Sequence, residues 1–319
     1  METSSFFITI APMRKFLGTL FLVVTFMMIG GCFLTVTNLV DDFPQDKKVK
    51  ESSILHMKLE GVILDPSKFL KDLKKYSKDE DIKGVLLQVN SPGGIVGPSQ
   101  EIYHELKRVR TELKKPVVVS TTGMAASGAY YAAVAANEIY ANEGSLLGSI
   151  GVIMEFANLE KLYAWMKIQR HVIKTGKYKD SGAEHRPMRE DEKQLFRSMA
   201  FEILNQFKAA IVDGRKLAPE LVTQYADGRV FTGETAQKLG FIDKIGTFED
   251  ARRAIGQLAG LGEDPDLFTP PKERPTLSDI LSEVKTPVKI EMPTQQLLKS
   301  QLWGQPLYLL PSALPQVTE

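Results

Sequence analysis

The chain has very few of the side chains that bind metals or form disulfides. Its 319 residues include a single cysteine, Cys32, and only four histidines. One cysteine excludes an intrachain disulfide framework and any metal site built from several cysteines. The histidines, at positions 56, 104, 171 and 185, are scattered, and none has the HExxH spacing of a zinc site. We therefore expect neither a metal nor a cofactor.

An excess of charge of either sign is also missing. Lys+Arg total 40 and Asp+Glu total 39, so the net charge is +1. Chains that bind nucleic acid usually carry a basic excess, so no nucleic acid partner is expected. The length allows one large domain or two ordinary ones, with enough apolar residues for a core. No internal repeat is visible, which favours a single functional unit.

One long segment lacks charge altogether. Residues 16–40, FLGTLFLVVTFMMIGGCFLTVTNLV, contain no charged side chain. About 20 apolar residues span the hydrocarbon core of a bilayer, so this segment is predicted to be a transmembrane anchor in contact with lipid. An alternative is a lipoprotein signal that is cleaved before Cys32, which follows Ile-Gly-Gly. The apolar run continues eight residues beyond that cysteine, and this favours an anchor that is not cleaved.

The orientation of this anchor is less clear from the sequence. Residues 1–15 are expected to be cytoplasmic, because Arg14 and Lys15 directly precede the span. Three lysines between positions 47 and 50 follow the span and compete with these two. The charge pattern alone leaves the side of the membrane open.

The rest of the chain divides into three parts by composition. Residues 41–52 are polar and contain proline, which is typical of a linker. Residues 53–263 are predicted to form the folded domain. Residues 264–319 are predicted to be a mostly irregular tail, because nine prolines fall between Pro265 and Pro315. Two stretches of this tail, LSDILSEV and QQLLKSQLW, could form short helices.

Within the domain, short apolar runs alternate with amphipathic stretches. The apolar runs, at 54–64, 82–90, 116–121 and 138–141, are predicted strands. The stretches between them have apolar residues at helical spacing, at 67–76 and 99–114. This order indicates parallel βαβ units in an α/β domain. Farther on, helices are predicted over 189–211 and, after the N-cap residue Thr232, up to Gly240.

Two turns after predicted strands carry candidate functional groups. The second strand ends in Ser-Pro-Gly-Gly at 91–94, where paired glycines would leave backbone N–H groups open to a ligand. The third strand leads into Gly-Met-Ala-Ala-Ser-Gly at 123–128. A helix that begins near Ser127 would direct its positive end toward the hydroxyl and favour an oxyanion. The alternative is a tightly packed helix start that Ser127 merely caps.

A nucleophilic serine needs a base, and no histidine lies in a comparable loop. A lysine can serve if burial lowers its pKa from the usual value of about 10.4. The stretch KTGKYKD offers Lys174, Lys177 and Lys179, and composition does not choose among them. Ser149, in the stretch GSIGV, is a hydroxyl that could hold a neutral lysine amine in place.

Taken together and in this order, these stretches resemble a known family. SPGG at 91–94, MAASGAYYAA at 124–133, GSIGVI at 148–153 and YKD at 178–180 resemble the signal peptide peptidase A (protease IV) family. ADGRVFTGETAQKLGFID at 226–243 fits a late motif of the same family. The resemblance covers residues 54 to 250. It implies a serine protease with a Clp-protease/crotonase-like α/β fold, built of repeated β-β-α/βαβ units and preceded here by the transmembrane helix.

The resemblance also implies a role for each motif residue. Ser127 would be the nucleophile and Lys179 the general base, so that the two form a Ser–Lys dyad. Ser149 would orient the amine of Lys179. The backbone N–H of Gly94, together with that of Gly128, would form the oxyanion hole. No histidine is then required.

The family also implies substrates, assembly and location. The expected substrates are residual signal peptides and other small unfolded peptides. The expected assembly is a homo-oligomeric ring, single-pass in the plasma (inner) membrane with its catalytic domain outside the cytoplasm. Two alternatives differ in class: a crotonase-type acyl-CoA enzyme, and a membrane scaffold that keeps the fold without activity. The membrane span and the Ser–Lys motifs argue against the first, and the intact dyad argues against the second.

Overall fold

The computed structural model describes residues 49–271 and 306–309. The predicted anchor at 16–40 and the two helices expected in the tail lie outside these residues. Within the described part, no helix combines the length and the apolar character needed to cross a bilayer. Residues 49–270 and 306–309 belong to one compact unit.

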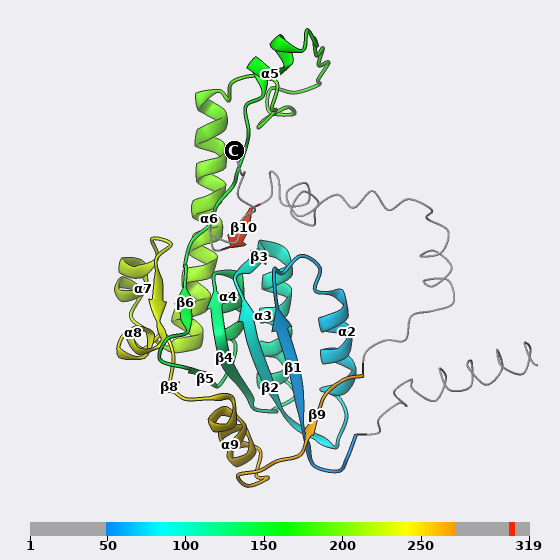
Figure 1. Cartoon of the computed structure of the whole chain (residues 1–319), viewed down its shortest axis with the longest axis vertical. Helices are drawn as coiled ribbons and strands as arrows, with labels where there is room; N and C mark the ends of the chain where they lie inside the picture. Colours follow the sequence, from blue (N-terminus) through cyan, green and yellow to red (C-terminus); the bar gives the residue numbers. More distant parts are fainter. Residues whose placement is uncertain (1–48, 272–305, 310–319) are drawn as a thin grey trace, which may run out of the picture. The chain divides into compact units, whose positions relative to one another are not determined.

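A mostly parallel sheet lies at the centre of this unit (Figure 1). Its eight described strands, in chain order, are β1 (Ser53–Glu60), β2 (Ile82–Ser91), β4 (Val117–Ala126), β5 (Glu138–Ala141), β6 (Leu146–Gly148), β7 (Val230–Thr232), β8 (Lys244–Ile245) and β9 (Leu267–Phe268). The main path runs β7-β6-β4-β2-β1-β9, and β5 pairs with β4 and with β8. The pair between β6 and β7 is antiparallel, whereas the other pairs are parallel.

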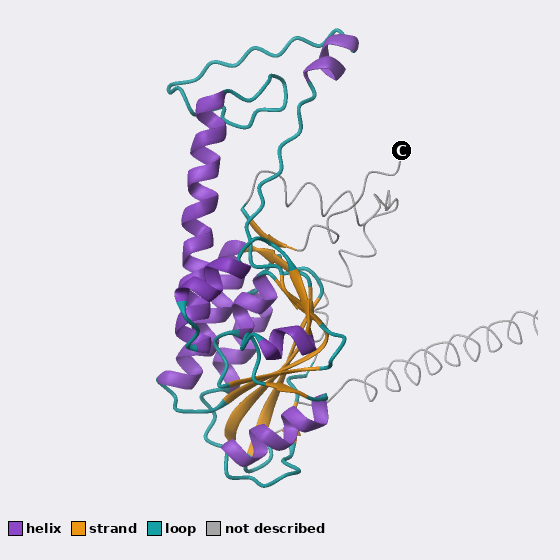
Figure 2. Ribbon diagram, turned by 90° about the vertical axis from the view of Figure 1, so that its left-hand side faces the viewer, coloured by secondary structure: helices purple, strands orange, loops and turns teal. Residues whose placement is uncertain are grey.

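Helices cover both faces of the sheet (Figure 2). The described helices are α2 (Ser67–Tyr76), α3 (Val96–Thr111), α4 (Gly128–Ala133), α5 (Glu160–Trp165), α6 (Glu190–Arg215), α7 (Pro219–Tyr225), α8 (Gly233–Lys238) and α9 (Phe248–Leu258). Alternate residues of β2 enter two different cores. Val85 and Leu87 pack in the large core with residues of α2, α3, α4 and α6, whereas Leu86 packs with Ile255 of α9. A strand that is buried on both faces needs a continuous apolar run, which is why 82–90 is apolar throughout.

Most of the predicted elements are confirmed. The strands at 82–90 and 138–141 and the helix at 67–76 have nearly the expected bounds, and Thr232 accepts a hydrogen bond from the Thr235 N–H at the start of α8. The strand expected over 54–64 ends at Glu60, because Gly61 has a φ of 69° and turns the chain. The strand expected to end at residue 121 continues to Ala126, directly before Ser127.

A second, two-stranded sheet differs from expectation. The glycine pair expected as a turn belongs to β3 (Gly93–Ile95), which pairs antiparallel with β10 (Leu307–Leu309). Strand β10 comes from the tail that was expected to be irregular. Leu307 and Tyr308 are both buried, so this part of the tail is packed into the domain.

Candidate active site

Ser127 lies at the sharp junction between β4 and α4. Its φ and ψ are 52° and −115°, a region that residues with a side chain rarely adopt. The side chain is 1% exposed, and its Oγ makes no hydrogen bond with any described residue. It also makes no capping hydrogen bond to α4, so the role of a simple helix cap is not supported. Backbone strain of this kind concentrates at functional sites.

The helix after Ser127 is shorter than a strong dipole would require. It begins at Gly128, as expected, but has only six residues. The useful electrostatic groups at this position are therefore individual backbone N–H groups, which the first turn of a helix leaves without an internal partner.

The glycines of β3 pack closely against neighbouring backbone, which for Gly93 includes the start of α4. A Cβ built on Gly93 would lie 2.1 Å from the carbonyl oxygen of Tyr308 and 2.7 Å from the nitrogen of Gly128. A Cβ on Gly94 would lie 2.1 Å from the carbonyl oxygen of Ile63. Only glycine fits at these positions. Gly94 and Gly128, the residues expected to form the oxyanion hole, therefore lie near each other and next to Ser127.

Ser149 lies beside Ser127. Strands β4 and β6 are parallel neighbours, and their register pairs Ala126 with Gly148. The Ser127 N–H donates to the Gly148 carbonyl at 2.7 Å. The next residue on each strand is a buried serine with positive φ, which is 49° at Ser149. The structure therefore brings these two predicted site residues together.

The three candidate lysines differ in their partners. Lys174 pairs with Asp180 at 2.5 Å, and Lys177 pairs with Asp191 at 2.6 Å. The hydrogen bond to Asp191 raises the pKa of Lys177, which leaves less of the neutral amine that a general base requires. The exposed Lys179 side chain makes no ion pair or hydrogen bond with any residue in the described ranges. Of the three, Lys179 has the amine that is not committed to a carboxylate.

A network of charges anchors the segment that carries Lys179 to the first turn of α6. Asp180, the next residue, accepts hydrogen bonds from Lys174 and Arg186, and these hold the pKa of its carboxyl far below the usual range. Arg186 also pairs with the buried Glu192 at 2.6 Å. Glu192 accepts a further bond from the Arg189 backbone N–H at 2.9 Å. Lys179 is thus positioned by its neighbours.

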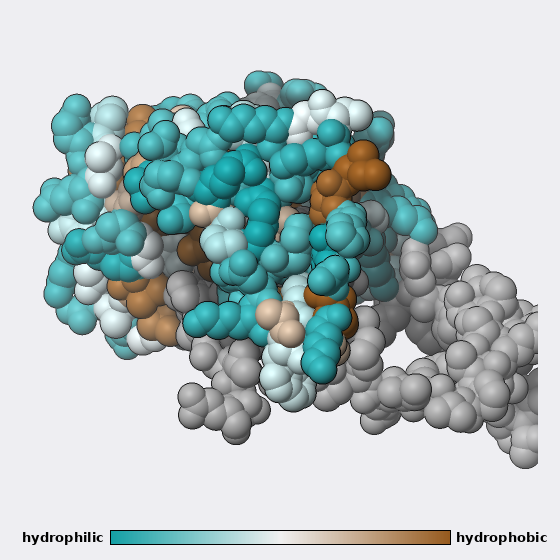
Figure 3. All heavy atoms as spheres, turned by 90° about the horizontal axis from the view of Figure 1, so that it is seen from above, coloured by the Kyte–Doolittle hydropathy of each residue, from teal (hydrophilic) through white to brown (hydrophobic). Residues whose placement is uncertain are grey.

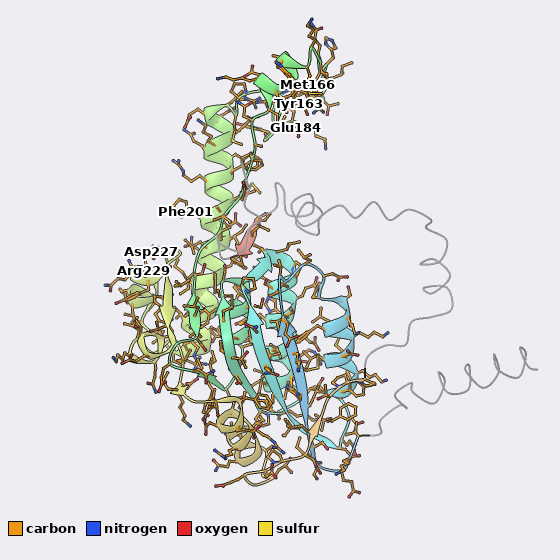
Figure 4. All side chains as sticks on the ribbon, viewed as in Figure 1. Tyr163, Met166, Glu184, Phe201, Asp227 and Arg229 are labelled. Atoms are coloured by element: carbon orange, nitrogen blue, oxygen red, sulfur yellow. The ribbon has the colours of Figure 1, made fainter. Side chains whose placement is uncertain are left out.

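Within one copy, Lys179 is remote from Ser127. Its segment is fastened to Glu192, whereas α4, which follows Ser127, packs through Tyr131 against Phe207. Phe207 lies fifteen residues after Glu192 on α6, which corresponds to about 22 Å along a helix axis. Figure 4 shows Tyr163, Met166 and Glu184 gathered around α5, with Phe201 farther along α6. Ser127 and Lys179 are not brought together in one chain, and the buried surroundings expected for the base are not found there.

Replacement of Gly94 by alanine is expected to lower activity at least tenfold. The new Cβ would meet backbone atoms of Ile63, at 2.1 to 2.6 Å, and a backbone cannot rotate away as a side chain can. The control is Gly97→Ala, since a Cβ at Gly97 meets nothing within 4 Å. Steady-state peptide hydrolysis measures both variants. Full activity in Gly94→Ala would show that the close backbone packing at Gly94 does not shape the active site.

The charge network predicts a pH-dependent stability. Hydrogen bonds from Arg186 lower the pKa of Glu192 to about 2, against about 4.3 for an unfolded chain. A lowered carboxyl pKa stabilises the fold above about pH 4.3, and this contribution is lost as the pH falls toward 2. At pH 7 the urea midpoint of Glu192→Gln should therefore lie below that of the wild type. The difference between the two midpoints should become smaller as the pH falls from 4.3 to 2.

The matched control is Glu190→Gln. The Glu190 side chain lies in the same turn of α6 but is 70% exposed, and it pairs with Lys193. Exposed pairs contribute little, so the urea midpoint should hardly change at either pH. If the difference in urea midpoint between Glu192→Gln and the wild type is the same at every pH, the role assigned to the Glu192 charge is wrong.

Sequence reasoning did not find the aromatic residues around this site. Tyr131, Phe207 and Tyr308 form a buried cluster with ring centroids 4.8 to 5.2 Å apart. The signal for Tyr308 was the short apolar run Leu-Tyr-Leu-Leu at 307–310, bounded by prolines. Such a run is typical of an edge strand, but the many prolines of the tail concealed it.

Comparisons with known proteins agree with the class that the fold and the strained serine indicate, a serine hydrolase on an α/β scaffold. The family model of peptidase family S49 matches residues 110–262, and that of Clp protease matches residues 65–143. A provisionally named protease of Synechocystis sp. is 41% identical over 62% of this chain and 69% of that protein. The chain belongs to peptidase family S49, and it is a serine peptidase related to SppA and protease IV, with a ClpP/crotonase-like α/β fold.

Two longer relatives carry more specific names. Serine protease SPPA, chloroplastic, of Arabidopsis thaliana is 32% identical over 72% of this chain and 34% of its own length. Protease 4 of Salmonella typhi is 33% identical over 65% of this chain and 33% of its own length. This chain therefore matches about a third of each of these two proteins.

Proposed function

We propose that this protein is a membrane-anchored serine endopeptidase that uses Ser127 as nucleophile and Lys179 as general base. The observation that carries the proposal is the Ser127 hydroxyl, which is buried, held on strained backbone and free of any hydrogen bond to a described residue. A hydroxyl that served packing alone would normally be paired when buried. Its position beside Gly94 and Gly128 supplies donors for an oxyanion.

In this mechanism Ser127 Oγ attacks the carbonyl carbon of the peptide while the neutral amine of Lys179 takes its proton. The N–H groups of Gly94 and Gly128 stabilise the oxyanion that forms. Lys179 then gives the proton to the leaving amine, and water hydrolyses the acyl-enzyme by the same route. Ser149, next to Ser127, orients the lysine amine by a hydrogen bond.

The dyad requires a second copy of the chain. The segment of Lys179 is fastened to Glu192, whereas the Ser127 region packs against Phe207, which lies about 22 Å farther along α6, too far for proton transfer within one copy. We propose that Lys179 reaches Ser127 of a neighbouring copy in a homo-oligomeric ring, where contact with that copy would also bury it. Enclosure would restrict the sites to unfolded peptides.

Apolar side chains near Lys179 support this assembly. Large apolar residues of the segment around α5 face solvent in the single chain, and Figure 3 shows apolar residues among hydrophilic ones on the face seen from above. These exposed residues are Leu162, Trp165, Met166, Ile168, Val172, Ile173 and Tyr178. A soluble surface rarely leaves so many apolar side chains uncovered, and a second copy would cover them.

The proposed substrates are residual signal peptides and other short unfolded peptides. Signal peptides are apolar, and the apolar side chains of Ile95 and Ile153 lie beside the two-stranded sheet that contains Gly94. The predicted anchor at 16–40 would hold the domain beside the bilayer into which such peptides are released. We place the domain on the outer face of the plasma membrane, which protease accessibility in intact cells and spheroplasts would test.

A fluorophosphonate probe tests the chemistry. The probe should label the wild type at Ser127, as identified by mass spectrometry of the labelled peptide. An acyl-CoA enzyme of crotonase type has no activated serine and would remain unlabelled, and so would an inactive scaffold. As the labelled fraction of the protein rises, hydrolysis of casein and of a synthetic signal peptide should fall in proportion. An unlabelled protein that hydrolyses neither substrate would refute the proposal.

A further inference from the structure

A cavity lies far from the active site, at the opposite edge of the main sheet. Its volume is about 770 Å³, and three segments line it: the loop from α2 into β2, the loop between α3 and β4, and the end of α9. Pro116, in its lining, directly precedes β4, whereas Ser127 directly follows that strand. The strand has ten residues and spans about 30 Å, so the cavity and the active site are separate. Figure 1 shows α9 and the start of β1 at this edge.

Lysine side chains dominate the cavity. Four lysines line it, against the single carboxylate of Glu80. These lysines are Lys78, Lys83, Lys114 and Lys115. None of the four forms an ion pair with any residue in the described ranges. The Lys83 Nζ donates to the Glu80 carbonyl at 2.8 Å, and the Lys115 Nζ donates to the Asp79 carbonyl at 2.6 Å. An ammonium has three N–H donors, so both of these lysines retain two for a ligand.

The cavity also has an unpaired hydroxyl in its lining. Ser77 is fully buried there, and its Oγ has no hydrogen-bond partner among the described residues. Buried hydroxyls are normally paired, so this one indicates a polar ligand. Burial also lowers the pKa of the Lys115 amine, an effect that a neighbouring anion would oppose. A compact anion with several oxygens, such as a phosphate group, fits this set of donors.

Apolar side chains complete the lining. Leu113, Pro116 and Ala259 are partly buried there, and Leu258 is 47% exposed. A phospholipid headgroup carries its phosphate next to glycerol and the first methylenes of the acyl chains, so it needs both polar and apolar contacts. Basic side chains beside exposed apolar ones are typical of surfaces that lie at a bilayer interface.

The chain enters the domain at this same edge. The Ser53 N–H, at the start of β1, donates to the Asp81 carbonyl at 2.8 Å, and the next residue, Ile82, lines the cavity. The predicted anchor ends at Val40, thirteen residues before Ser53. A fully extended chain of that length reaches at most about 45 Å. An anchor that spans the bilayer would therefore keep the cavity close to the lipid surface.

We propose that this cavity binds the headgroup of an anionic phospholipid, whose phosphate is held by the four lysines and the Ser77 hydroxyl. This inference rests on the membrane placement in the proposed function and not on the activity of Ser127. Attraction between basic groups and anionic lipid extends only about 10 Å from the surface, so the contact adds to the anchor and does not replace it. It would turn the edge with the cavity toward the bilayer and keep Ser127 about 30 Å from the lipid.

Acetylation of lysines measures this contact at single residues. The full chain is placed in nanodiscs of phosphatidylcholine, with or without phosphatidylglycerol, and the rate at each lysine is followed by mass spectrometry. Phosphatidylglycerol should slow the acetylation of Lys83 and Lys114 about fivefold or more. The control is Lys68, an exposed lysine at the other end of α2, whose rate should hardly change. Unchanged rates at Lys83 and Lys114, or equal slowing at Lys68, would overturn the inference.

A second measurement uses variants of the full chain in neutral detergent, where the anchor is not in a bilayer. Short-chain phosphatidylglycerol should raise the thermal midpoint of the wild type. Ser77→Ala removes a hydroxyl that no described residue pairs with, so the midpoint without lipid should hardly change, whereas the affinity for the lipid should fall about fivefold. Lys83→Gln combined with Lys114→Gln should abolish the lipid-induced shift, and Lys68→Gln should retain it. A shift that survives in the double variant would contradict the assigned site.

Free phosphates distinguish the source of the anion. If inorganic phosphate or glycerol phosphate raises the midpoint as strongly as the lipid does, the cavity binds a soluble anion and the assignment to lipid is wrong. If neither these anions nor the lipid changes the midpoint, the site itself is wrong. Fluorophosphonate labelling of Ser127 in the same samples would show that only this inference fails. A chain that binds the lipid but is never labelled would support this inference and refute the proposed peptidase activity.

Discussion

Ser127→Ala is expected to reduce peptide hydrolysis by about 10⁴-fold or more, because no other group can form the acyl-enzyme. The fold should survive. The lost hydroxyl has no hydrogen-bond partner among the described residues, so its removal leaves no buried group unpaired. Alanine at this position retains the small volume that the turn allows. The thermal midpoint should therefore equal that of the wild type within a few degrees, while labelling by fluorophosphonate disappears.

The matched control for this experiment is Ser120→Ala. Ser120 is a buried serine on the same strand, β4, but it lies well before the turn. Its replacement should leave labelling and hydrolysis close to those of the wild type. An active Ser127→Ala enzyme would show that the nucleophile is another residue, and the strained backbone at Ser127 would then need a different explanation.

Lys179→Ala is expected to lower kcat by about 10²- to 10⁴-fold, the range typical of a lost general base. Lys177→Ala should retain most of the activity, since Lys177 is already committed to Asp191. Lys174→Ala should retain a substantial part, with some loss because Lys174 helps to hold Asp180 next to the base. An inactive Lys177→Ala together with an active Lys179→Ala would reverse the assignment of the base.

The same variant tests whether the dyad forms between copies. Co-expression of Ser127→Ala chains with Lys179→Ala chains should restore part of the activity, because some sites in mixed rings join an intact serine to an intact lysine. A dyad within one chain would give no recovery. Sizing of a soluble chain that begins at residue 46 completes the test, and an active monomer would exclude the ring.

The candidate site could be predicted from the sequence to the extent that its residues lie close together along the chain. The stretch MAASG places a hydroxyl after a strand, and the structure confirms the strand, the turn and the helix start around Ser127. Ser149 follows a short strand whose pairing with β4 the sequence did not specify, yet the parallel register brings the two serines together. In these two cases the sequence motif was enough to place the serine, because each motif includes the end of the strand that precedes its serine.

The contacts that distinguish Lys179 from its two neighbouring lysines, and the pocket of Tyr308, could not be predicted in this way. Lys174, Lys177 and Lys179 are equivalent in composition, and only folded contacts show that the first two pair with carboxylates. Tyr308 lies more than 170 residues from Tyr131 in the sequence, and no local pattern relates them. Their contact depends on long-range packing, for which local periodicity carries no information.

By itself, the sequence determined the α/β class, the elements that precede each reactive turn and the family whose motifs this chain shares. These properties depend on local conformational preference and on apolar periodicity, which are encoded within ten to twenty residues. Only the tertiary structure decided that Lys179 lies far from Ser127 in its own copy and that the tail contributes a strand beside the glycines. Both depend on how remote segments pack, because backbone pairing in β10 uses groups that every residue has and that no side-chain pattern marks.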